Sequence, residues 1–167
     1  MSTRTRTIVS LGAFYGVTAL AAAGGALATR SSVKTWYPTL RKPPFNPPSW
    51  LFGPVWSALY LAMATAAWRV WRKRHDGADE DIVRRSTTLY GVQLALNSAW
   101  SILFFGLRSP AVALAEIGVL WTAIIAWYRS VVAVEPGSGK LILPYIGWTT
   151  FAAVLNGSIW WLNRDRT

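Results

Sequence analysis

The sequence predicts an all-α membrane protein in which five transmembrane helices form one bundle. Apolar residues make up 53% of the 167-residue chain and charged residues only 14%, whereas a soluble domain carries about 25% charged residues. Five apolar runs are long enough to cross a hydrocarbon core, which takes about 20 helical residues. Eleven tryptophans add a residue type that is enriched at membrane interfaces. Because backbone groups in lipid must bond internally, helical runs of this kind predict a bundle.

The five runs belong to a single domain, residues 1–167. In chain order they cover residues 8–29, 51–71, 82–107, 111–134 and 141–162. The first run follows Arg4 and Arg6 and so resembles a signal peptide. Its 22 residues exceed an ordinary signal-peptide core, and no convincing cleavage site follows, so we expect a retained helix.

Loop charge predicts the orientation of the bundle. The amino terminus and the second and fourth loops carry ten Lys and Arg residues, against seven on the opposite side. This bias places the amino terminus in the cytoplasm, and we expect a bacterial cell membrane.

Several classes of site are disfavoured. The net charge of +10 could suggest nucleic acid, but the cations lie between the apolar runs and form no continuous patch. The chain has no cysteine, and its one histidine, His75, lies in a charged loop, so we expect no metal site. We expect no nucleic-acid partner and no required cofactor.

The loop between the first two helices is unusual. The stretch WYPTLRKPPFNPPSWLFGPVW, residues 36–56, holds six prolines and three tryptophans. Proline fixes its own φ and pushes the preceding residue toward extended geometry. The sequence therefore predicts a structured, stiff loop whose aromatic side chains cover the mouth of the bundle as a lid.

Three helices each carry an aromatic stripe at helical spacing. The stripes comprise Phe52, Trp56 and Tyr60; Asn97, Trp100 and Phe104; and Trp148, Ala152, Leu155 and Asn156. An amide is disfavoured against lipid, so the stripes with Asn97 and Asn156 are expected to face inward. They could line an aromatic pocket for a planar ligand, with Asn97 as a hydrogen-bonding group, or they could simply be bundle core.

These residues also carry a family resemblance. The 36–56 stretch, together with QLALNSAWSILFFG in the third helix and LPYIGWTTFAAVLN in the fifth, closely resembles the signatures of the translocator protein family, also called tryptophan-rich sensory proteins or peripheral-type benzodiazepine receptors. The three motifs occur in the expected order and cover nearly the whole chain.

The resemblance implies a five-helix protein that binds porphyrins and related hydrophobic ligands in a pocket open toward the first loop. The residues that match ligand-lining positions, or share a stripe with them, are Tyr37, Phe52, Trp56, Tyr60, Asn97, Trp100, Phe104, Trp148 and Ala152. Arg41 and Lys42 are the nearest cations for porphyrin propionates, although they could equally face lipid headgroups. The sterol-recognition tyrosine of animal members is missing from LNGSIWWLNR, so specific sterol binding is in doubt.

Two further features have open interpretations. Glu116 is the only acidic residue within an expected span, and it could serve structural pairing, a hydrogen bond in its protonated state, or the handling of ligand or protons. Gly91, Ala95 and Ala99 form a ridge of small residues on the third helix. This ridge resembles the dimer face of bacterial members and predicts a homodimer, although it could also serve packing within one chain.

The leading functional hypothesis is a porphyrin-binding sensor that transports or regulates tetrapyrroles. A second hypothesis is a light-dependent porphyrin-degrading enzyme, with the porphyrin as substrate and Trp56 and Trp148 as electron donors. A third is a structural scaffold in the lipid bilayer, which would bind no ligand saturably.

Overall fold

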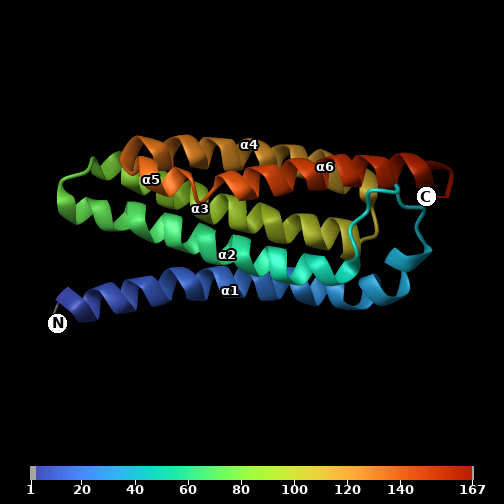
Figure 1. Cartoon of the computed structure of the whole chain (residues 1–167), viewed down its shortest axis with the longest axis horizontal. Helices are drawn as coiled ribbons and strands as arrows, with labels where there is room; N and C mark the ends of the chain where they lie inside the picture. The colour runs from blue at the N-terminus through green and yellow to red at the C-terminus, as the bar shows by residue number, and fades with distance from the viewer. Residues whose placement is uncertain (1–2, 167) are drawn as a thin grey trace.

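The computed structural model describes residues 3–166 as a bundle of five long helices (Figure 1). Met1, Ser2 and Thr167, which we included in the single domain, lie outside the described residues. The long helices are α1 (Thr3–Thr35), α2 (Ser49–Arg72), α3 (Glu80–Ser101), α4 (Pro110–Val134) and α6 (Leu143–Asn163). Shorter helical segments are η1 (Tyr37–Thr39), η2 (Lys73–Asp76), the π-helix η3 (Ile102–Gly106), α5 (Pro136–Gly139) and η4 (Arg164–Arg166). The prediction of an all-α membrane protein is confirmed.

The helix ends follow local chemistry. The Asp79 side chain caps α3 by accepting hydrogen bonds from the backbone N–H groups of Asp81 and Ile82, at 2.8 and 3.2 Å. Gly77 reverses the chain before it with a φ of 82°. Pro110 begins α4, where a missing N–H costs least. The helix α1 extends beyond the apolar run 8–29 at both ends. The polar residues on either side of this run contain no glycine or proline, and the first proline is Pro38.

Three of the long helices are apolar and long enough to cross a membrane on their own composition; they lie within Thr5–Thr35, Ser49–Asp76 and Pro110–Val134. The helices α3 and α6 are more polar than we expected for spans. Their polar residues include Gln93, Asn97, Thr149 and Asn156, all of which are buried. The polar side chains that lower the hydropathy of α3 and α6 below that of the three apolar spans are therefore enclosed within the bundle.

The two ends of the bundle differ in what closes them. At one end lie η2 and α5; at the other, the segment between α1 and α2 runs across to the carboxyl end of α6 (Figure 1). We call residues 36–48 the lid and this end the lid end. The helix α1 lies at the edge of the bundle and is the most exposed of the long helices, with Leu20 76% and Leu27 74% exposed. In a membrane protein such a surface faces lipid or another chain.

Candidate ligand pocket

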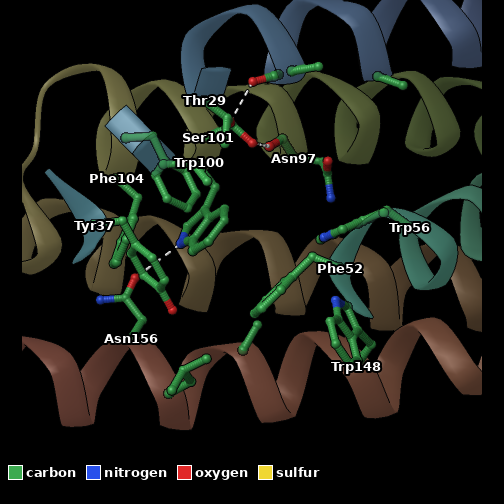
Figure 2. Close-up of a pocket in the computed structure, with 18 of the residues that line it drawn as sticks. Thr29, Tyr37, Phe52, Trp56, Asn97, Trp100, Ser101, Phe104, Trp148 and Asn156 are labelled. Carbon is green, nitrogen blue, oxygen red and sulfur yellow. Dashed lines mark hydrogen bonds between the residues drawn. The ribbon is translucent and has the colours of Figure 1, made fainter. Parts of the chain in front are cut away.

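A cavity of about 390 Å³ lies in the lid half of the bundle. All nine residues that we predicted to line a ligand site lie on its wall: Tyr37, Phe52, Trp56, Tyr60, Asn97, Trp100, Phe104, Trp148 and Ala152. Figure 2 shows Phe52, Trp56 and Trp148 on one side of it, with Tyr37, Trp100 and Phe104 on the other. The aromatic stripes thus surround a hollow. That they bind a ligand stays a prediction.

The aromatic rings of the wall support one another. Trp100 and Phe104 stack with ring centroids 5.2 Å apart and planes 22° apart. Trp56 lies 5.4 Å from Tyr60, and Phe52 meets Trp148 edge to face at 5.8 Å. Such pairs add about 0.5–1.5 kcal/mol beyond the burial of area. The walls of the cavity are therefore formed by coupled pairs of rings.

A chain of hydrogen bonds leads from the cavity into the core. The Tyr60 hydroxyl donates to Asn97 Oδ1 at 2.8 Å, and Asn97 Nδ2 donates to the Tyr145 hydroxyl at 3.1 Å. Tyr145 in turn donates to Gln93 Oε1 at 2.9 Å. Asn97 therefore holds a fixed orientation between α2 and α6. Our sequence analysis missed Tyr145 and Gln93, whose only signal was a polar group within an apolar run.

A second amide fixes the opposite wall. Trp100 Nε1 donates to Asn156 Oδ1 at 3.1 Å (Figure 2). Asn156 Nδ2 donates to the Pro110 carbonyl at 2.7 Å, which ties α6 to the first turn of α4. The orientation of the Trp100 indole is thus set by a side chain that is itself anchored at both ends.

The helix α1 supplies a wall of small residues that the sequence analysis did not predict. Its lining residues are Ala22, Gly25, Ala26, Thr29 and Val33. They share one face of the helix, which the spacing could have revealed. We overlooked them because they form no aromatic or amide pattern. Their short side chains leave open the space that the rings on the other helices face.

The π-helix η3 shapes the end of α3 beside the lid. Its wider turn carries Phe104 and Phe105, both of which line the cavity. The two rings meet edge to face at 4.8 Å, and Tyr37 of the lid contacts both. Short π-helical turns are frequent at functional sites. Here the turn brings two successive aromatic side chains against the lid.

The lid is organised around Lys42. Lys42 Nζ donates to the backbone carbonyls of Tyr37 and Leu40 at 2.8 and 3.1 Å, with the Pro38 carbonyl at 3.4 Å. It also lies 4.9 Å from the centre of the Tyr37 ring. These contacts occupy the ammonium group that we had considered for propionates, whereas the Arg41 side chain is exposed. Among the described residues that line the cavity, none is charged.

Tyr37 joins the lid to the cavity. Its hydroxyl donates to Asn46 Oδ1 at 2.6 Å, and Asn46 Nδ2 donates to the Pro47 carbonyl at 3.0 Å. Burial raises the pKa of the Tyr37 phenol above its ordinary value, and the hydrogen bond to Asn46 opposes part of that shift. The phenol is therefore neutral at physiological pH, in keeping with an uncharged cavity.

Comparison with known proteins identifies the family. Residues 14–162 match the model of the TspO/MBR family. The chain belongs to this family. It is 37% identical over 158 residues to the translocator protein of Sus scrofa, with 90% of each chain covered. It is 35% identical over 160 residues to the tryptophan-rich protein TspO of Chlorobaculum tepidum, covering 93% of this chain and 97% of that one. It is 36% identical over 152 residues to the tryptophan-rich sensory protein of Cereibacter sphaeroides, covering 90% and 92%.

Membership of the TspO/MBR family confirms the resemblance drawn from the three motifs. The structure narrows the two interpretations that the sequence left open, for Glu116 and for the ridge of small residues. The carboxylate oxygens of Glu116 are enclosed and have no hydrogen-bond partner among the described residues, so neither the pairing nor the hydrogen bond that we considered is made within the described part of the chain. On α3, Gly91 and Ala95 are exposed, so the ridge of small residues does not serve packing within the described chain at these two positions.

Proposed function

We propose that this TspO/MBR member is a membrane-embedded binding protein for porphyrins and related planar, hydrophobic ligands. The observation that carries the proposal is the cavity of about 390 Å³, walled by aromatic rings and free of charged side chains among its described lining residues. Ligand pockets typically combine apolar and aromatic walls with a few fixed polar groups. Here those groups are Asn97 and Asn156, both held in place by hydrogen bonds.

The chemistry of the wall favours a flat ligand. Aromatic rings stack or meet edge to face with other π-systems, and the stacked pair Trp100 and Phe104 offers such a surface. No described hydrogen bond uses the indole N–H of Trp56 or Trp148, which leaves two donors for acceptor atoms of a ligand. Ionised groups such as propionates would remain at the mouth, near Arg41, because the cavity offers them no counter-charge.

Relatives suggest the cellular role. They are named translocator protein and tryptophan-rich sensory protein, and we extend to this chain a role in sensing or moving the ligand. We further propose that the amino terminus faces the cytoplasm, from the loop charge, and that two copies associate through Gly91, Ala95 and Ala99 of α3.

The test is a titration of the purified protein with protoporphyrin IX in the dark, followed by tryptophan fluorescence. We expect saturable quenching, and Trp148→Phe should remove a larger share of the quenched signal than Trp161→Phe. Trp161 is the matched control because it is 59% exposed and does not line the cavity. An absence of saturable quenching would refute the proposal and leave the scaffold hypothesis.

Illumination of the same samples separates binding from catalysis. An unchanged porphyrin spectrum supports a sensor or carrier. A light-driven loss of the porphyrin band that Trp56→Phe or Trp148→Phe prevents, with binding retained, would assign degradation to these tryptophans.

A further inference from the structure

The lid is bonded to the far end of the chain by one side chain. The backbone N–H of Arg41 donates to Asn163 Oδ1 at 3.0 Å, and Asn163 Nδ2 donates back to the Arg41 carbonyl at 2.9 Å. The carboxamide thus pairs with the backbone N–H and C=O of one lid residue, as a residue of a neighbouring β-strand would, across 122 positions of sequence. Asn163 is 2% exposed, so water does not compete for these bonds.

Capping of α6 alone does not account for this arrangement. Asn163 Nδ2 also donates to the Ile159 carbonyl of its own helix at 2.8 Å, which satisfies the end of α6. The two bonds to Arg41 are additional, and they fix the position of the lid relative to α6.

The contact lies at the edge of the cavity. Ile159 lines the cavity, and Asn163 follows it by one helical turn on the same face. On the other side of the contact, the lid contributes Tyr37 to the cavity wall. Breaking the pair between Arg41 and Asn163 would therefore open the wall between lid and α6.

The lid itself is braced so that it can move as one body. Lys42 bonds the carbonyls of Tyr37 and Leu40, and Tyr37 bonds Asn46. Its remaining contacts to the bundle include the aromatic pairs Trp36 with Phe104 and Phe45 with Phe151. These edge-to-face contacts tolerate a range of ring positions, whereas the paired amide requires one registration of the lid against α6.

We propose that Asn163 is a positioning residue that latches the lid and thereby sets the rate of ligand exchange. The part of this inference that concerns ligand rests on the proposed function. The latch itself is independent of any ligand and can be tested without one.

Trypsin provides the ligand-free test on the full chain in detergent. The Arg41–Lys42 bond is a trypsin site in the lid, whereas Pro43 protects the bond after Lys42. Cleavage requires the lid to leave its bonded conformation. Asn163→Leu should accelerate cleavage after Arg41 about tenfold, the scale of one to two lost hydrogen bonds. Asn163→Asp keeps the acceptor for the Arg41 N–H but sets a carboxylate oxygen against the carbonyls of Arg41 and Ile159, so it should also accelerate cleavage.

Ser158→Ala is the matched control. It removes a single bond to the Val154 carbonyl on the same helix, and it touches neither lid nor cavity. If Asn163→Leu is cleaved after Arg41 no faster than Ser158→Ala, the latch is refuted.

Dissociation of protoporphyrin IX provides the second test. We expect its off-rate to rise about tenfold in Asn163→Leu, because changes in affinity at one site appear mainly in dissociation. If cleavage accelerates while on- and off-rates stay unchanged, the ligand exchanges by another route and the gating role is refuted. If the unmodified protein binds no porphyrin saturably, the proposed function fails, and the cleavage test still decides the latch.

A cross-link between the lid and α6 tests the proposal in the opposite direction, by preventing the lid from opening. The chain has no native cysteine, so Arg41→Cys with Asn163→Cys creates a unique pair. The comparison is made within this double variant, because Asn163→Cys removes the carboxamide of the latch and Arg41 is the cation that we place near the propionates. Joined by a short, cleavable bis-maleimide, the variant should release porphyrin more slowly than the same variant after the linker is cleaved. An off-rate that does not respond to the linker would contradict the proposal.

Discussion

The two halves of the bundle both combine small residues with aromatic rings, but one half is tightly packed and the other encloses a cavity. Away from the lid, small residues of α2, such as Ala66 and Ala67, pack in one core cluster with Trp127 and Tyr145, and Met63 and Ile142 are fully buried there. In the lid half, small residues of α1 face large rings on α2, α3 and α6, yet about 390 Å³ stays open.

The difference lies in what the rings meet. In the lid half, Tyr60 is bonded to Asn97 and Trp100 to Asn156, so these rings cannot turn into the space without losing a hydrogen bond. In the other half, Tyr90 is bonded to Thr18 and Tyr145 to Gln93, and apolar side chains pack around these rings. Hydrogen bonds therefore hold rings in both halves, and in the lid half they hold them beside open space. We expect stability and ligand binding to respond separately to changes in the two halves.

The largest effect should follow from Trp127→Ala in the packed half. Trp127 is fully buried, and its ring lies 5.3 Å from that of Tyr90. Truncation of a buried tryptophan to alanine costs about 3–5 kcal/mol of unfolding free energy. Denaturant titration in detergent should show this loss, while porphyrin affinity of the folded fraction stays the same. A loss below about 1 kcal/mol would mean that this half is not the stabilising core.

The next effect should come from filling the hollow half. Ala152→Phe places a ring inside the cavity and should weaken porphyrin binding about a hundredfold, or about 2.7 kcal/mol, with little change in unfolding. Val154→Phe adds the same group to a position 56% exposed on the same helix and should leave binding unchanged. Equal binding by both variants would show that porphyrin does not occupy this cavity.

The smallest effect should appear where the halves meet, in Tyr145→Phe. The change preserves the edge contact with Trp56 at 6.2 Å but removes the hydroxyl that bonds Asn97 and Gln93. Leaving Asn97 Nδ2 and Gln93 Oε1 without the Tyr145 hydroxyl should cost about 1–3 kcal/mol, measured by the same unfolding titration, with a modest loss of porphyrin affinity. A change in only one of the two quantities would indicate that the hydrogen-bond chain does not couple the halves.

The sequence predicted the aromatic walls and the lid of the hollow half, but not the hydrogen bonds that hold them in place. Helical spacing placed the stripes of α2, α3 and α6 around one interior, and the prolines predicted a structured lid. Tyr145, Gln93 and Asn163 escaped prediction because their roles depend on partners 48, 52 and 122 positions away. Lys42 escaped because a lysine at an interface normally faces water or headgroups, whereas here the lid folds around its ammonium group.

The length of α1 has a consequence for where the lid lies. Its 33 residues extend about 50 Å at 1.5 Å per residue, against a hydrocarbon core about 30 Å thick. With the apolar run 8–29 centred in that core, the helix carries the lid past the acyl chains and into the headgroup layer. At that depth Trp50, 70% exposed, has the environment that indole prefers. A porphyrin dissolved in the bilayer would meet the lid at the level where amphiphiles collect, so partitioning into the membrane would set the concentration that the protein encounters.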